Sequence, residues 1–114
     1  MDKSLILKKF IESAIKNGEA VEKGESKKAN KEFDLLQKYY LQLKESESIN
    51  ILSPLLESNN KYVQLWSSYY LLSIETKRSE IILEELSQIR GLISITAKIT
   101  LKEWKKGTLR FPGN

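Results

Sequence analysis

An apolar helical pattern that follows a short polar turn restricts the fold of this chain more than any other feature. Residues 55–72 read LLESNNKYVQLWSSYYLL, and Asn59-Asn60 separates the two apolar stretches. After the turn, apolar side chains recur at helical spacing and cover more than half of the helix circumference. A helix that is apolar on so many sides has to be surrounded by other helices. We therefore expect a central helix over residues 61–75, which Asn59-Asn60 can cap.

The N-terminal part of the chain carries two more segments with the apolar spacing of amphipathic helices. The first covers residues 4–23. Glycine weakens a helix, but Ala14 and Gly18 are about one turn apart and would let a neighbouring helix approach, so we favour a continuous or kinked helix over a break. The second should follow the helix-stopping Gly24, with Ser26 as a plausible N-cap.

Three further helices are expected around the central one. The third helix of the chain should begin near Ser48, with Pro54 acceptable only in its first turn or at a kink. The fifth has Ser79 as a candidate cap and should end before Gly91, and the sixth should span residues 92–106.

These six helices predict an all-α fold, because no strand alternation or hairpin dipeptide competes with the helical periodicity. Short turns between the helices suggest about six helices stacked as three antiparallel hairpins, a HEAT-like repeat array. Internal repetition is weak, so an irregular helical bundle is the alternative. We expect one domain over residues 1–107 and a loosely packed tail over residues 108–114, whose Leu109 and Phe111 could still dock on the helices or on another chain.

Composition excludes several classes of function. With 40% hydrophobic and 30% charged residues and no apolar run of about 20 residues, the chain should be soluble, and no membrane partner is expected. Its N-terminus lacks the apolar core of a secretory signal, which favours a cytoplasmic location. The 114 residues include neither cysteine nor histidine. We therefore expect no enzyme, no catalytic residues, no metal site and no cofactor.

Three segments, in this order, resemble a small bacterial family of HEAT-like helical proteins of unestablished function. They are GESKKANKEFD from Gly24, LLE at residues 55–57 followed by VQLWSSYYLL from Val63, and AKITLKEWKKG from Ala97. Where related proteins often have alanines after the central tryptophan, this chain has Ser67 and Ser68. Some small helical proteins of this kind look like immunity partners of secreted bacterial toxins, so the resemblance implies a toxin-neutralising role.

The net charge of +4 is concentrated toward the C-terminus, where residues 58–114 carry nine Lys or Arg and five Glu. Lys98, Lys102 and Lys105 are spaced by four and three, so they form a basic stripe along one helix face. Such a stripe is most often a solvated surface. Its other uses are to bind an acidic protein or a phosphate backbone.

Several aromatic and polar residues are further candidates for contact with a partner. Adjacent helical residues point about 100° apart, so the tyrosines cannot all face inward. We expect Tyr39, Tyr62 and Tyr69 to contribute to a binding face, whereas the two tryptophans belong to the core. Asn30 and Asp34 lie one turn apart and either anchor a polar ligand or, more in keeping with their types, cap a neighbouring turn.

Together these features predict a non-catalytic protein-protein interaction module, with an immunity protein as its most specific version. The alternative is a nucleic-acid-binding helical protein that uses the C-terminal basic stripe.

Overall fold

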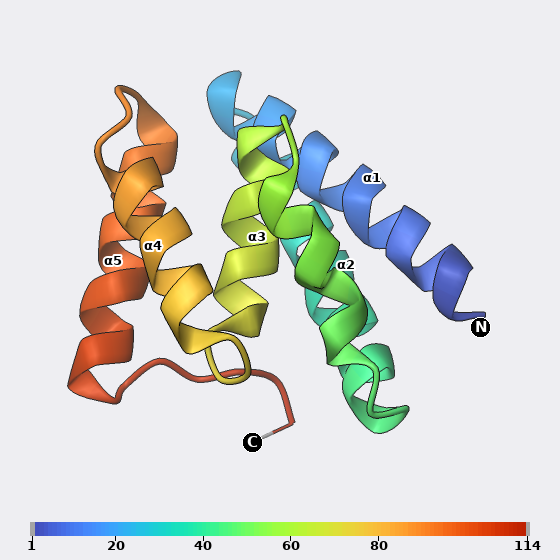
Figure 1. Ribbon diagram of the computed structural model, residues 1–114. Coiled ribbons are helices and arrows are strands. Elements are labelled where there is room, and N and C mark those ends of the chain that lie inside the picture. Colours follow the sequence, from blue (N-terminus) through green and yellow to red (C-terminus); the bar gives the residue numbers. More distant parts are fainter. Residues whose placement is uncertain (1, 114) are drawn as a thin grey trace.

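The computed structural model, which describes residues 2–113, shows an all-α protein built from three consecutive antiparallel pairs of helices (Figure 1). The elements in chain order are α1 (Lys3–Glu22), α2 (Ser26–Glu45), η1 (Ile49–Glu57), α3 (Lys61–Leu71), α4 (Thr76–Ser87) and α5 (Leu92–Lys106). In Figure 1, α1 and α2 lie on the right, α3 in the middle, and α4 and α5 on the left. The all-α prediction is confirmed, while a regular HEAT-like repeat stays a prediction. Across residues 2–113, every helix is too short or too polar to traverse a lipid bilayer.

Helix α3 is the centre of the molecule, as its apolar sequence predicts. It packs against α1, η1, α4 and α5, and Leu65, Tyr70 and Leu71 are 0% exposed. Asn60 caps its first turn, because the side-chain Oδ1 accepts hydrogen bonds from the backbone N–H groups of Tyr62 and Val63 at 3.0 and 3.1 Å. The predicted cap and the predicted central position are therefore both confirmed.

Helix α1 runs without a break through Gly18, and the glycine allows the close approach expected from its spacing with Ala14. A Cβ atom added at Gly18 would lie 2.4 Å from both Cγ and Cδ2 of Tyr62 on α3. The Tyr62 ring therefore rests directly on the α1 backbone. Its hydroxyl donates a 2.6 Å hydrogen bond to Oε2 of Glu22, one turn further along α1.

A buried asparagine joins the first three α-helices. The Asn17 side chain is 4% exposed, and its Nδ2 donates to the carbonyl oxygen of Ala29 on α2 at 3.0 Å. Its Oδ1 accepts a 2.9 Å hydrogen bond from the indole Nε1 of Trp66 on α3. Asn17 thus satisfies the buried Trp66 donor and fixes the relative positions of α1, α2 and α3.

The third element differs from the predicted helix. Residues Ile49–Glu57 form a 3₁₀-helix with Pro54 inside it, not in the first turn, and Ser48 precedes the helix without forming a side-chain cap. A proline interrupts an α-helix because it lacks an N–H donor and clashes with the preceding turn. The tighter 3₁₀ geometry accommodates this segment, and the Gln64 Nε2 group ties it to α3 by donating to the Leu56 carbonyl at 2.8 Å.

Two predicted serine caps are wrong. Ser26 is the first residue of α2, and no side-chain cap hydrogen bond precedes it. Helix α4 begins at Thr76, so Ser79 lies inside the helix and the predicted cap is wrong. Ser79 is 0% exposed, and its hydroxyl has no hydrogen-bond partner among the described residues. Ser67 and Ser68 are also 0% exposed, but their hydroxyls donate to the carbonyls of Val63 and Leu65 at 2.7 and 2.9 Å. Both serines therefore fit a tightly packed α3.

The segment after α5 docks on the helices through Phe111, which is the alternative to a loosely packed tail that the sequence leaves open. In Figure 1 it passes from the end of α5 beneath α4 and α3 toward the first pair of helices. Phe111 is 7% exposed, and its ring centroid lies 5.4 Å from that of Tyr69 and 6.0 Å from that of Tyr40. The tail thus connects the last helical pair with α2.

Candidate protein-interaction surface

Helix α5 exposes an apolar row on the side that faces away from the core. Leu92, Ile95 and Ile99 are 46%, 52% and 56% exposed. Their spacing of three and four places them on one face of the helix, and we call this row the α5 stripe. Of the six large hydrophobic side chains that are exposed among the described residues, these three are the only ones that share a single helix.

The α5 stripe exists because this helix has two apolar faces. Ile93, Ala97 and Leu101 are buried against the rest of the molecule. Ile95 and Ile99 point away from this buried face, since each is two positions from Ala97 and therefore about 200° around the helix. The spacing of Ile93, Ala97 and Leu101 indicates the buried face alone, whereas the spacing of the two isoleucines relative to Ala97 indicates this second face.

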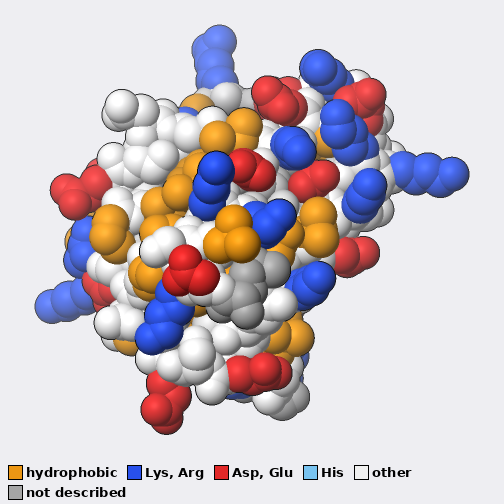
Figure 2. Space-filling view, turned by 90° about the vertical axis from the view of Figure 1, so that its right-hand side faces the viewer, with side chains coloured by type: hydrophobic (Ala, Val, Ile, Leu, Met, Phe, Trp, Pro, Cys, Tyr) orange, Lys and Arg blue, Asp and Glu red, His pale blue; other side chains and the backbone are white. Residues whose placement is uncertain are grey.

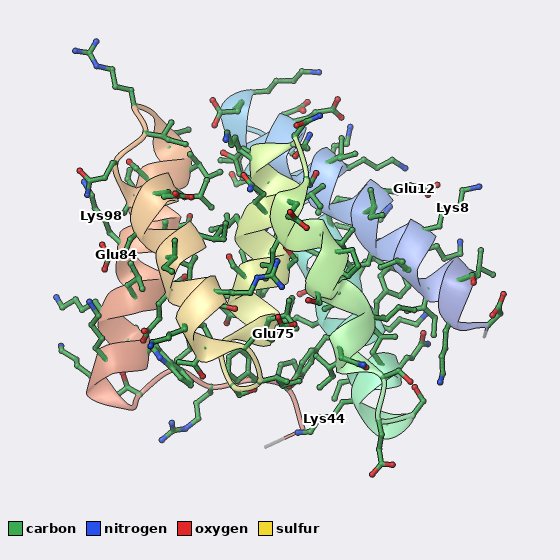
Figure 3. The ribbon with its side chains drawn as sticks, in the orientation of Figure 1. Lys8, Glu12, Lys44, Glu75, Glu84 and Lys98 are labelled. Carbon is green, nitrogen blue, oxygen red and sulfur yellow. The ribbon has the colours of Figure 1, made fainter. Side chains whose placement is uncertain are left out.

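The predicted basic residues lie beside the α5 stripe. Lys98 and Lys102 are exposed, and neither takes part in an ion pair within residues 2–113. Figure 3 shows Lys98 and Glu84 on the outer side of the α4/α5 pair. Lys105 differs, because its Nζ lies 3.2 Å from Oε1 of Glu84. Both partners of this pair are more than half exposed, so water screens the interaction and it contributes little to stability.

A shallow hollow between α4 and α5 adjoins the predicted basic residues. Its lining includes Glu80, Ile81, Glu84 and Lys105. The indole Nε1 of Trp104 donates a 3.0 Å hydrogen bond to Oε2 of Glu80, which links the two helices. Trp104 is thus partly buried and structural, in agreement with its predicted place in the core.

The three predicted tyrosines are not gathered on this surface. Tyr39 is 7% exposed, because it lies on the side of α2 that packs into the core. The prediction that it contacts a partner is therefore wrong. Tyr62 is half-buried against Gly18 on α1. Tyr69 is half-buried too, with its ring centroid 5.4 Å from those of Trp66 and Phe111. The structure therefore separates these tyrosines from the lysines of α5.

Burial keeps the central phenols protonated. Burial raises the pKa of Tyr70 well above its ordinary value, and the neighbouring Tyr69 and Tyr40 raise it further. The Tyr70 hydroxyl donates to Oε1 of Gln37. Burial also raises the pKa of Tyr62, with a further contribution from its hydrogen bond to the Glu22 carboxylate. These hydroxyls therefore stay protonated near neutral pH and act as hydrogen-bond donors inside the protein.

Asn30 and Asp34 lie together on the exposed face of α2. They line a shallow hollow with Lys27, Lys31 and Lys38. No side-chain hydrogen bond or ion pair of either residue occurs within the described part of the chain. The predicted role as a cap for a neighbouring turn is therefore wrong, because both side chains point into solvent.

The surface of α1 differs from that of α5 in its charge pattern. Figure 2 shows the side of the molecule that carries α1, where Lys, Arg, Asp and Glu side chains stand between the apolar ones. Lys8 and Glu12, one turn apart, project from the outer side of α1 (Figure 3). Helix α1 carries charges of both signs, with Lys3, Lys8, Lys9 and Lys16 beside Glu12, Glu19 and Glu22, whereas the only acidic residue of α5 is Glu103. The combination of apolar and basic side chains is thus characteristic of α5.

No group of three or more metal-ligating carboxylates is found within residues 2–113. Comparison of the chain with protein-family models, with curated proteins and with solved structures found no match.

Proposed function

We propose that this chain is a non-catalytic protein-binding module that contacts another protein through the outer face of α5. The observation that supports this most strongly is the α5 stripe, an uncovered row of large aliphatic side chains on one helix. Contiguous apolar surface of this kind is typical of protein interaction sites, because its removal from water stabilises a complex. The adjacent lysines supply the polar border such a site requires.

A bacterial toxin is the most specific partner in this proposal, and the family resemblance alone supports it. In that version the chain binds the toxin as an immunity protein and carries out no chemistry of its own. The toxin-neutralising role and the general binding role share the same surface. They differ in the identity of the partner, which the neighbouring genes can provide.

Co-expression of the chain with the product of each neighbouring gene, followed by purification, tests the proposal. We expect a stoichiometric complex that is lost in the double variant Ile95→Asp/Ile99→Asp, because both charges would be buried without a partner. Ile74→Asp is the matched control, since Ile74 is 50% exposed but lies in the loop between α3 and α4. Absence of any complex, or a complex that tolerates the double variant, would contradict the proposal.

Nucleic-acid binding is the second candidate, supported by the exposed Lys98 and Lys102, which lack ion-pair partners among the described residues. It ranks second because Glu84 already pairs with Lys105, and because phosphate backbones offer nothing to an aliphatic row. The test is binding to single-stranded and duplex nucleic acid over a salt series. Binding that weakens with salt and disappears in Lys98→Ala/Lys102→Ala/Lys105→Ala would favour this function instead.

A further inference from the structure

We propose that the part of the partner that seats on the α5 stripe is an amphipathic helix whose apolar side chains are bordered by Asp or Glu. This inference rests on the proposed function, and it names the chemistry of the contacting element.

The length and spacing of the α5 stripe fit a helix. Leu92 and Ile99 are seven residues apart, so the row extends for about 10 Å along the helix axis. Three aliphatic side chains at spacings of three and four form a ridge, and the matching surface is the groove of a second helix with apolar residues at the same intervals. The exposed fractions of 46%, 52% and 56% leave each of these side chains free to enter such a groove.

The charge beside the stripe selects an acidic partner. Lys98, Lys102 and Lys106 are exposed and are spaced by four, so they form a basic row next to the aliphatic one. Glu103, the only acidic residue of α5, is partly buried. Asp or Glu at the border of the incoming helix would meet these lysines, which speeds association and excludes partners with basic borders.

The same charge argues against a second copy of this chain as the occupant. In a symmetric antiparallel pair of α5 helices centred on the α5 stripe, Leu92 of each copy would lie opposite Ile99 of the other, and Lys98 and Lys102 would meet no carboxylate of the facing α5. The chain's own C-terminal segment does not cover the stripe either. It turns away from α5 and places Phe111 against Tyr40 and Tyr69.

A lipid surface is also a poorer occupant than a protein helix. Membrane-bound amphipathic helices combine a cationic face with an apolar face in which Trp and Phe often accompany Leu. The one aromatic residue of α5 is Trp104, and its indole N–H is already bonded to Glu80.

Selection from a displayed peptide library tests the proposal with the full chain as the target. Each peptide carries fixed leucines at helical spacing, and the positions that border the leucines are randomised. We expect selected peptides to be enriched in Asp and Glu at these borders and to bind more weakly as salt increases. Ile99→Asp and Lys98→Ala/Lys102→Ala/Lys106→Ala should each reduce binding of a selected peptide at least tenfold, while Ile74→Asp leaves it unchanged.

Four outcomes would overturn the proposal. Two concern the peptides: no enrichment of acidic residues at the borders, or binding of selected peptides that tolerates Ile99→Asp. The other two are binding of the chain to phosphatidylserine vesicles and self-association in sedimentation, if Ile99→Asp abolishes either. Circular dichroism of each variant confirms that loss of binding is not loss of folding. A complex that copurifies through the α5 stripe while the selected peptides show neutral or basic borders would refute the acidic helix and leave the proposed function standing.

Discussion

At the scale of single residues, the contact between Gly18 and Tyr62 determines how closely α1 approaches α3. A Cβ at position 18 would lie 2.4 Å from two ring atoms of Tyr62. We predict that Gly18→Ala destabilises the protein by about 1–3 kcal/mol, because this overlap outweighs the higher helix propensity of alanine. In a Tyr62→Ala background the two ring contacts are absent and only the Cβ of residue 62, 2.9 Å away, remains, so the same substitution should cost clearly less. Urea unfolding of the four proteins measures both effects, and an equal effect of Gly18→Ala in both backgrounds would refute the account.

The buried hydrogen bond between Asn17 and Trp66 should stabilise the folded protein. Asn17→Ala removes the acceptor of the buried Trp66 N–H and should lower the free energy of unfolding by about 1–3 kcal/mol. Trp66→Phe removes the donor from the same hydrogen bond, so the double variant should cost less than the sum of the two single changes. Strict additivity in urea unfolding would show that the hydrogen bond contributes nothing.

The sequence predicts individual residues well where a local rule decides their role. Asn60 caps α3 because its side chain needs only the next three residues, all of which are adjacent in the chain. The partner of Asn17 could not be predicted, because Trp66 is 49 residues away along the chain and only the packing of α1 on α3 brings the two together. The prediction that Tyr39 lies on a binding face is wrong for the same reason, since burial of this side chain depends on the core that forms around it.

At the scale of elements, the C-terminal segment behaves as part of the core. Phe111 is 7% exposed and contacts aromatic rings of α2 and α3. We predict that Phe111→Ala lowers the free energy of unfolding by about 3 kcal/mol, as expected for a buried phenylalanine. Deletion of residues 108–114 should cost a similar amount, whereas the exposed Arg110→Ala should change stability by less than about 0.5 kcal/mol. Unfolding in which Phe111→Ala matches the Arg110→Ala control would show that the segment is not docked.

Helix boundaries are predictable from the sequence where a stop residue marks them. The 3₁₀ geometry of η1 is not. Gly107 ends α5 in a left-handed conformation with a φ of 75°, as its position after the last apolar residue indicates. The 3₁₀ form of η1 depends on how Pro54 and its neighbours pack beside α3, which apolar spacing alone does not encode. The second apolar face of α5 follows from the sequence when the positions two residues on either side of Ala97 are considered.

At the scale of the whole molecule, the buried aromatic centre predicts a loss of stability in alkali. The pKa of Tyr70 is raised in the folded protein, while in the unfolded chain this phenol ionises near pH 10. Above about pH 10 the unfolded state therefore binds fewer protons than the folded state, so the free energy of unfolding falls as pH rises.

Tyr70→Phe provides the measurement of this effect. Below about pH 10 ionisation of the Tyr70 phenol should leave the free energy of unfolding unchanged, and above it wild type should lose up to about 1.4 kcal/mol per pH unit more than Tyr70→Phe. Loss of the hydrogen bond to Gln37 lowers the free energy of unfolding of Tyr70→Phe by the same amount at every pH below about 10. It therefore does not affect how the slopes of the two curves compare. Urea unfolding from neutral to alkaline pH provides both curves, and parallel curves would contradict the burial of this phenol.

The most direct measurement of the central claim is the affinity of the copurified complex, determined by calorimetric titration for two matched variants. Ile99 and Ile74 are 56% and 50% exposed, and they differ chiefly in their location on α5 and in the α3–α4 loop. If the α5 stripe is the binding surface, Ile99→Asp lowers the affinity at least about tenfold, or about 1.4 kcal/mol, while Ile74→Asp changes it by less than about 0.5 kcal/mol. Equal effects of the two substitutions, or no effect of Ile99→Asp, would contradict the claim.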